Sequence, residues 1–204
     1  MKKFLLVAAG LAMAAGANAA MAADQGWYVS GALGASLLPA LNMTGATSTA
    51  HSSFNAGYAY GGAVGYDMGN GWRYELDSVH QLSGLDRIGG TLASGHLQST
   101  SLMANATYDL PVDWIVTPYV GAGVGFANVG GAIDGLSGGD VWEPAYQVEA
   151  GLRKNLGDNY SLFTEYRFTQ SEAAKFADPA LSLAANQHFD DHQLMVGVSY
   201  RFNP

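Results

Sequence analysis

The sequence predicts an all-β fold, an eight-stranded antiparallel up-and-down transmembrane β-barrel. Eight segments alternate apolar residues with small or polar ones, as strands with two different faces do. Their connections run long, short, long, short, long, short, long, which in an up-and-down barrel collects the short turns at one end. Aromatic residues concentrate near both ends of the apolar face, where the interfaces of a bilayer favour amphipathic rings.

The composition suits this fold and excludes several functions. The 204 residues include 27 glycines and no cysteine, and only 13% are charged, about half the usual share. Without cysteine there is no disulfide framework, no thiolate nucleophile and no cysteine-ligated metal. The 17 acidic residues against 9 Lys and Arg argue against a nucleic-acid partner, which needs a basic face.

The first 22 residues predict a signal peptide. Lys2 and Lys3 precede an apolar run over residues 4–15, and Ala17-Asn18-Ala19 and Ala20-Met21-Ala22 are two small-x-small cleavage sites. Cleavage is expected after Ala19 or Ala22, leaving a barrel domain over residues 23–204. The alternative, a membrane-anchoring helix, needs about 20 apolar residues, more than this run provides. Export by this route indicates the envelope of a Gram-negative bacterium.

The eight strands are expected at Trp27 to Leu37, Asn55 to Met68, Trp72 to Leu82, His96 to Leu110, Trp114 to Asn128, Trp142 to Leu156, Tyr160 to Gln170 and His192 to Phe202. The short turns are 69–71, 111–113 and 157–159, and the long polar connections are 38–54, 84–95, 129–141 and 171–187. Outer-membrane barrels have short periplasmic turns and longer external loops, so the four long connections are expected outside the cell.

The last predicted strand has the clearest pattern. One face carries Leu194, Val196, Val198, Tyr200 and Phe202, and the residues between them are mostly small or polar and include Arg201. Such a strand is half apolar and half polar. Its apolar face, ending in aromatics, is predicted to be the closing-strand signal of an outer-membrane barrel.

A soluble lipocalin-like barrel is the alternative fold. It would place its apolar face inward and its charges outward on every strand. In this sequence the charges share a face with glycine, serine and alanine, which are too small to build a soluble core. The pattern therefore favours the membrane barrel.

The charges on this small-residue face predict a plugged lumen. They are Arg73, Glu75, Asp77, Glu149, Arg153, Glu165, Arg167 and Arg201. Four positive residues face four negative ones, and buried charges are tolerated when they are paired and hydrogen-bonded. Because an eight-stranded barrel is narrow and filled by side chains, we interpret these eight as an interlocked ion network. The alternative is a selectivity filter or a gated pore.

The signal peptide, alternating strands, interior charges and aromatic closing strand together resemble the small outer-membrane β-barrel family. That family includes the OmpA transmembrane domain, the OmpX-like proteins and the opacity-type surface proteins. The resemblance covers the mature chain as a pattern and implies a structural, adhesin or surface-antigen role, sometimes with weak pore activity.

Catalytic and metal-binding patterns are weak. His188, Asp190, Asp191 and His192 could activate water as in the omptin proteases, but those are ten-stranded, and we interpret these residues as solvated rim residues. His51-Ser52-Ser53 loosely resembles the lipid A deacylases, yet it lies in the first long loop. His80 and His96 could approach each other, although two histidines alone are a weak metal signal. No catalytic residue, cofactor or metal is predicted.

The sequence therefore predicts a monomer in the outer membrane with a non-enzymatic, structural or surface-interaction role. Its expected partners are outer-membrane lipid and lipopolysaccharide, the outer-membrane assembly machinery and an extracellular ligand bound by the loops, and not nucleic acid. Two alternatives stay open: a small diffusion porin, and an outer-membrane hydrolase acting on lipid A or peptides.

Overall fold

The computed structural model describes residues 25–37, 41–44, 49–54, 57–88, 91–133, 136–137, 142–171, 176–178, 183–185 and 189–202. The signal peptide predicted for residues 1–22 lies outside this part of the chain. In the described part, no helix has both the length and the apolar character needed to cross a membrane.

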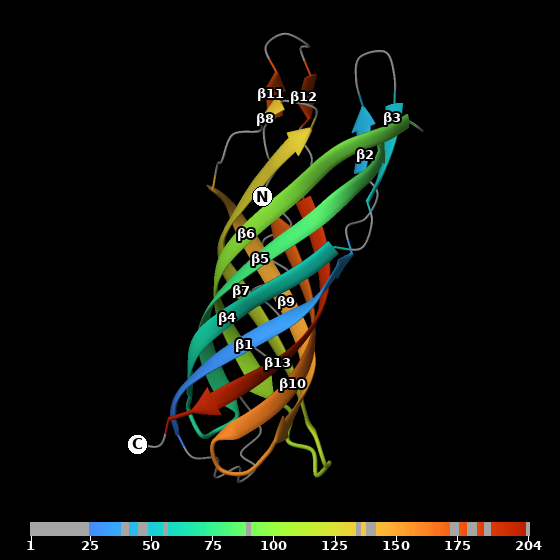
Figure 1. The fold of residues 1–204 in the computed structure, drawn as a ribbon. Coiled ribbons are helices and arrows are strands. Elements are labelled where there is room, and N and C mark those ends of the chain that lie inside the picture. The colour runs from blue at the N-terminus through green and yellow to red at the C-terminus, as the bar shows by residue number, and fades with distance from the viewer. Residues whose placement is uncertain are drawn as a thin grey trace.

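Eight long strands close into one antiparallel barrel (Figure 1). They are β1 (Gly26–Leu37), β4 (Gly57–Asp67), β5 (Trp72–Ile88), β6 (Thr91–Asp109), β7 (Thr117–Ile133), β9 (Trp142–Asn155), β10 (Tyr160–Ser171) and β13 (Phe189–Arg201). Each pairs with the next, and β1 pairs with β13, so none of these eight strands is left at an edge. The predicted eight-stranded up-and-down barrel is confirmed.

The register of the pairs tilts the strands strongly. Trp27 of β1 is paired with a residue of β4, that residue with one of β5, and so on around the barrel. Followed through all eight strands, this series of paired residues returns to β1 at Leu37, ten residues after Trp27. A stagger of this size in an eight-stranded barrel corresponds to strands tilted about 40–45° from the axis. Residues that meet in the lumen therefore come from different heights along their own strands.

Burial alternates along every barrel strand, as a period of two requires. Outward apolar side chains are exposed, including Leu33, Val64, Leu76, Val124 and Val196. On β13 the predicted closing-strand residues Leu194, Val196, Val198 and Phe202 are exposed, whereas Met195 between them is buried. This wall of exposed apolar side chains is what the hydrocarbon of a bilayer requires, and it excludes the soluble lipocalin-like alternative.

Aromatic rings pair across strands at the end with the short turns. The ring centroids lie 5.3 Å apart in Trp27–Tyr66, 5.0 Å in Trp72–Tyr108 and 5.0 Å in Tyr160–Tyr200. Such rings suit the boundary between lipid and water. We call this row the inner aromatic belt.

The turns after β4 and β9 are tight. Met68 N donates to Trp72 O at 2.9 Å and Leu156 N to Tyr160 O at 2.7 Å. Gly157 has a φ of 95°, in the left-handed region that only glycine enters without strain.

The opposite end differs from the prediction. The expected loop 84–95 is wrong at both ends, because β5 continues to Ile88 and β6 begins at Thr91, and the two strands stay paired. Likewise β7 runs to Ile133, inside the expected loop 129–141. Gly84 and Gly95 suggested the ends of a loop, but the backbone pairing of β5 with β6 continues through both residues.

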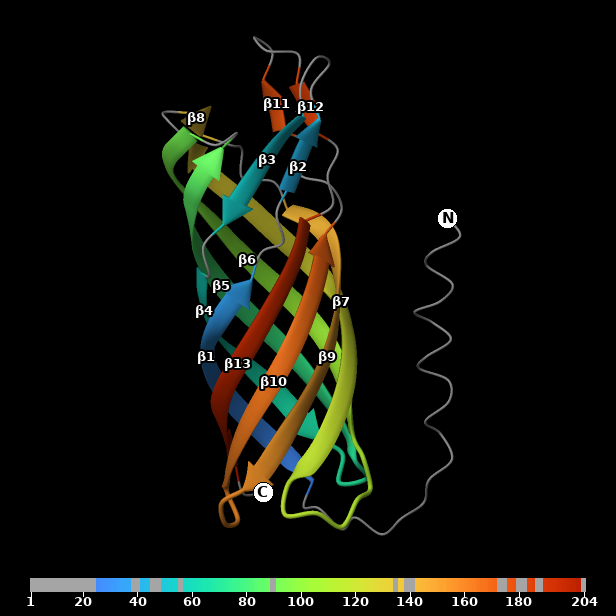
Figure 2. The same cartoon turned by 90° about the vertical axis from the view of Figure 1, so that its right-hand side faces the viewer.

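The long connections also contain strands. They are β2 (Leu41–Thr44), β3 (Thr49–Phe54), β8 (Leu136–Ser137), β11 (Phe176–Asp178) and β12 (Leu183–Ala185). The hairpins β2–β3 and β11–β12 stand beyond the barrel rim (Figure 2). The predicted loops 38–54 and 171–187 are thus partly ordered into hairpins.

Candidate functional site

The candidate site is the charged interior of the barrel. Its side chains come from the inward positions of the strands, which alternate with the lipid-facing ones. The lumen is narrow enough to be filled by side chains. What this interior can do therefore depends on which groups meet across it.

Arg167 is the centre of the network. Its Nη1 donates to Asp77 Oδ2 at 2.7 Å and its Nε to Glu165 Oε1 at 2.9 Å, and its Nη2 lies 3.6 Å from Glu149 Oε2. Around the barrel, β5 and β10 stand opposite each other, with three strands between them on either side. The Arg167–Asp77 bond therefore spans the full width of the lumen.

Two amides extend this contact. Asn105 Nδ2 donates to Asp77 Oδ2 at 2.8 Å, and Gln147 Nε2 donates to Asn105 Oδ1 at 3.1 Å and to Glu149 Oε2 at 3.2 Å. Asn105, Gln147 and Glu149 are buried. The amides join β6 and β9 to the ion cluster.

A second ion cluster lies at the short-turn end. Arg73 Nη1 donates to Asp109 Oδ2 at 2.9 Å, and Arg153 Nη1 donates to Asp109 Oδ1 at 3.0 Å. Both guanidinium groups lie over the Tyr119 ring, at 5.5 and 4.6 Å from its centroid. One carboxylate thus holds two arginines from strands β5 and β9.

Arg201 belongs to the same end. Its Nη2 donates to Asp67 Oδ2 at 3.0 Å. Asp67 and Asp109 were not among the interior charges predicted from the sequence. The signal was available, because each occupies the last inward position of its strand before a short turn.

Two tyrosines also donate hydrogen bonds to predicted carboxylates of the lumen. Tyr28 Oη donates to Glu75, and Tyr119 Oη donates to Glu165 Oε2 at 2.8 Å. Glu75 thus has a tyrosine as its hydrogen-bond partner, where an arginine was expected.

The interior is acidic. Seven carboxylates take part in its side-chain hydrogen bonds, namely Asp67, Glu75, Asp77, Asp109, Glu149, Glu165 and Asp191. Four guanidinium groups do so, those of Arg73, Arg153, Arg167 and Arg201. The expected balance of four against four is therefore wrong. Most of the surplus negative charge lies around Arg167, which has three carboxylates beside it. The three other arginines share the two carboxylates of Asp67 and Asp109.

Apolar side chains border the Arg167 cluster. Met103 and Met195 are buried in the lumen, with Val79 and Ala59 packed beside Met195. Beyond them Ser36 Oγ donates to Asp191 Oδ1 at 2.7 Å. Among the described residues, the groups that form hydrogen bonds at this outer end are hydroxyls, amides and the Asp191 carboxylate.

At least two small cavities lie between the described groups. One, of about 30 Å³, is lined by Glu75, Asp77, Glu165, Arg153 and Arg167 among others. The second, of about 20 Å³, lies at the short-turn end beside Arg73 and Arg201. They have room for on the order of two and one water molecules.

The candidate catalytic residues do not converge. Asp190 faces outward and accepts a hydrogen bond from Gln170, whereas Asp191 faces the lumen. His192 faces outward, and its Nδ1 lies 2.6 Å from Tyr166 Oη. His80 faces outward against Thr100. His51, Ser52 and Ser53 lie on β3, and their side chains, like those of His96 and His188, fall outside the described part. Among the described residues no group of three metal-ligating side chains could hold a metal ion.

Comparison with known proteins agrees with this architecture. Residues 5–202 match the family model described as the outer membrane protein beta-barrel domain. An "Outer membrane protein" of Gluconacetobacter diazotrophicus is 27% identical over an alignment that covers 73% of this chain and 47% of the relative. This chain therefore matches only about half the length of that curated relative.

Solved structures share the fold. The crystal structure of Neisserial surface protein A has 17% identity and a TM-score of 0.57, and the alignment covers 86% of this chain and 97% of that chain. OprG from Pseudomonas aeruginosa has 13% identity and a TM-score of 0.54, with 88% and 97% covered. At these identities the likeness establishes the barrel fold alone.

Proposed function

The chain belongs to the outer-membrane β-barrel protein family and resides in the outer membrane of a Gram-negative bacterium, and on that premise we propose that it is a closed-lumen barrel. In this proposal the protein has a structural or surface-interaction role. The barrel anchors the outer hairpins, and the lumen does not conduct.

The contact between Arg167 and Asp77 carries the proposal. It joins opposite walls of the barrel at 2.7 Å, and the side chain of Asp77 is only 2% exposed. Opening a path here would separate Arg167 from three carboxylates, and breaking buried pairs of this kind is costly. The small volumes of the two cavities support the same reading, because hydrated ions need a continuous passage.

The outer hairpins are the proposed interaction surface. β2–β3 and β11–β12 project beyond the rim, opposite the end with the short turns (Figures 1 and 2). Loops carry specific binding more often than the scaffold that positions them. Lipopolysaccharide and an extracellular ligand are the partners proposed for this end.

Conductance tests the closed lumen. The mature protein, refolded in detergent, should migrate differently on gels when unheated and when boiled, and should give no steady conductance in planar bilayers. Arg167→Ala, which removes the group that spans the lumen, should introduce conductance steps, and Lys154→Ala, on the outer wall, should not. Steady conductance of the unchanged protein would replace this proposal with the small diffusion porin.

We also propose a non-enzymatic role. It is supported by the divergence of Asp191 and His192, which point to opposite sides of β13. Mass spectrometry of lipid A from cells with and without the protein should give identical masses. A mass difference would favour the hydrolase.

A further inference from the structure

One turn at the inner end of the barrel is unlike the other two. Residues 110–116 form a seven-residue connection between β6 and β7, whereas 68–71 and 156–159 have four residues each. Its sequence is Leu-Pro-Val-Asp-Trp-Ile-Val, so Asp113 is its one charged residue. Turns are usually built from glycine, asparagine and other polar residues, so an apolar turn calls for a separate explanation.

The apolar side chains of this turn are open to the surroundings. Trp114 is 67% exposed and Ile115 is 83% exposed. Large apolar side chains left in water lose the stabilisation that burial would give them. The barrel itself does not bury them, so their environment is something outside the chain.

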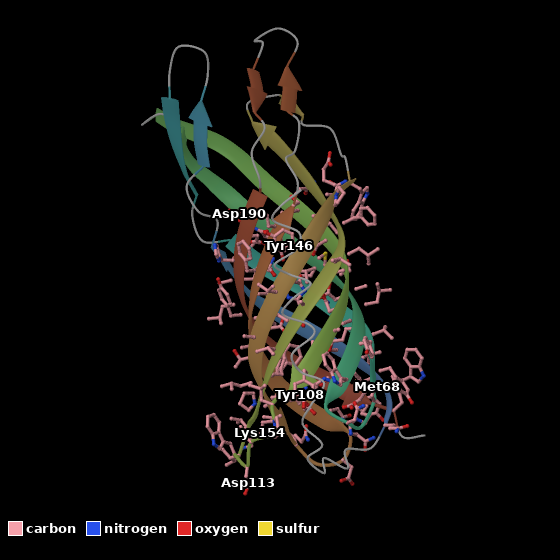
Figure 3. All side chains as sticks on the ribbon, turned by 180° about the vertical axis from the view of Figure 1, so that it is seen from behind. Met68, Tyr108, Asp113, Tyr146, Lys154 and Asp190 are labelled. Atoms are coloured by element: carbon pink, nitrogen blue, oxygen red, sulfur yellow. The ribbon has the colours of Figure 1, made fainter. Side chains whose placement is uncertain are left out.

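Backbone hydrogen bonds fix the turn to the end of the barrel wall. Leu110 N donates to Pro118 O at 2.8 Å, which fixes the base of the turn, and Val112 N donates to Leu110 O at 2.8 Å. Figures 1 and 3 show the turn extending beyond the end of the barrel at one side, with Asp113 at its lower end. A turn at the side of the barrel end lies next to the surface of the surrounding lipid.

The turn continues the inner aromatic belt. It begins two residues after Tyr108, whose ring packs against Trp72. Thr117 pairs with Arg153, so the next step of the register sets Val116 beside Lys154. Lys154 is exposed on the outer wall and takes part in no ion pair among the described residues.

We propose that this turn is a lipid anchor: Trp114 and Ile115 insert into the boundary between headgroups and acyl chains of the periplasmic leaflet, and Lys154 binds the phosphate of an anionic phospholipid there. Tryptophan prefers this boundary because its ring is apolar and its N–H is polar. Lysine reaches the headgroups while its methylene chain stays in the apolar region. A soluble protein or a second copy of the chain would bind the same apolar tip, and the experiment below separates these occupants.

Single-tryptophan variants test the anchor. The first variant keeps Trp114 alone and carries the substitutions Trp27→Phe, Trp72→Phe and Trp142→Phe. The control variant keeps Trp72 of the inner aromatic belt alone and carries Trp27→Phe, Trp114→Phe and Trp142→Phe. Both are refolded into phosphatidylcholine vesicles, with and without phosphatidylglycerol, and folding is checked by the gel shift on heating. Quenching is measured with iodide in the water and with lipids brominated at different depths.

The anchor predicts blue-shifted Trp114 emission, several-fold less quenching by iodide than for free tryptophan, and strongest quenching by the shallowest bromines. Emission typical of water, with full access to iodide, would overturn it. Protection that disappears when the protein is diluted in lipid would assign the tip to a second copy and would also overturn it.

Lys154→Gln tests the phosphate contact in the Trp114-only protein. Phosphatidylglycerol should shift the emission of the parent further to the blue, and Lys154→Gln should abolish this additional shift. An additional shift of the same size in Lys154→Gln would remove lysine from the proposal. The substitution leaves the lumen contacts intact, so a normal gel shift on heating should accompany either result.

Discussion

Replacing Arg167 by leucine should destabilise the barrel more than any other single change to its interior charges. Leucine fills part of the same space but leaves Asp77, Glu149 and Glu165 without their shared cation. Breaking one buried ion pair typically costs about 3–5 kcal/mol, mostly because the remaining charge has no partner. The Asp77 and Glu149 side chains are only 2% and 0% exposed, so bulk water does not screen the charges left behind, and we expect a cost of about 4–5 kcal/mol.

The assay is equilibrium unfolding by urea in phosphatidylcholine vesicles, which contain no anionic lipid for Lys154 to bind, followed by tryptophan fluorescence. Lys154→Leu is the matched control, because it removes an exposed cation from the outer wall of β9, and we expect it to change stability by less than about 0.5 kcal/mol. If the cost of Arg167→Leu arises from surplus carboxylates, adding Glu149→Gln and Glu165→Gln should recover about 1–3 kcal/mol of it. A cost as small as that of the control, or no recovery in the triple variant, would refute the reasoning.

Other substitutions probe separate parts of the interior. Glu149→Gln alone should change the free energy of unfolding by less than about 1 kcal/mol, since Arg167 keeps Asp77 and Glu165 as partners; a loss of several kcal/mol in the urea assay would contradict this. Asp109→Asn should lower the free energy of unfolding by about 1.5–3 kcal/mol, because this one carboxylate pairs with both Arg73 and Arg153. An unchanged urea midpoint would show that these arginines need no anion. Gly125→Ala should cost about 1–3 kcal/mol or prevent refolding, because the added methyl group would lie 2.0 Å from Leu102 O. Gly31→Ala should refold normally, because nothing lies within 4 Å of its methyl group. Equal behaviour of the two variants on heat-shift gels would count against the close approach at Gly125.

Much of the wall could be predicted from the sequence, because the inward or outward direction of a side chain depends only on its position along a strand. Val196 and Met195 illustrate this: one is exposed to lipid and the other is buried in the lumen. Likewise the turn at 157–159 was recognisable, because Gly157 and its polar neighbours suit a reversal of the chain.

The partners inside the lumen could not be predicted in the same way. Arg167 meets Asp77, 90 residues away, because of the ten-residue stagger around the barrel, and that stagger is a property of all eight pairings together. The strand ends at Ile88 and Ile133 were missed for a related reason. Whether a glycine-containing segment stays extended depends on the neighbour it pairs with, and Gly95, for example, pairs with Ile133.

The pairing of β1 with β13 has a consequence for how the protein is made. These two strands lie at opposite ends of the described chain, and their contact completes the ring. Until β13 arrives, the unpaired backbone groups of β1 and β10 are open edges on which another chain could add a strand. Contacts between residues so distant in sequence also form slowly. Closure is therefore expected to be the last and slowest event of folding, and a chain truncated before Phe189 should aggregate through its edges and not form a smaller barrel.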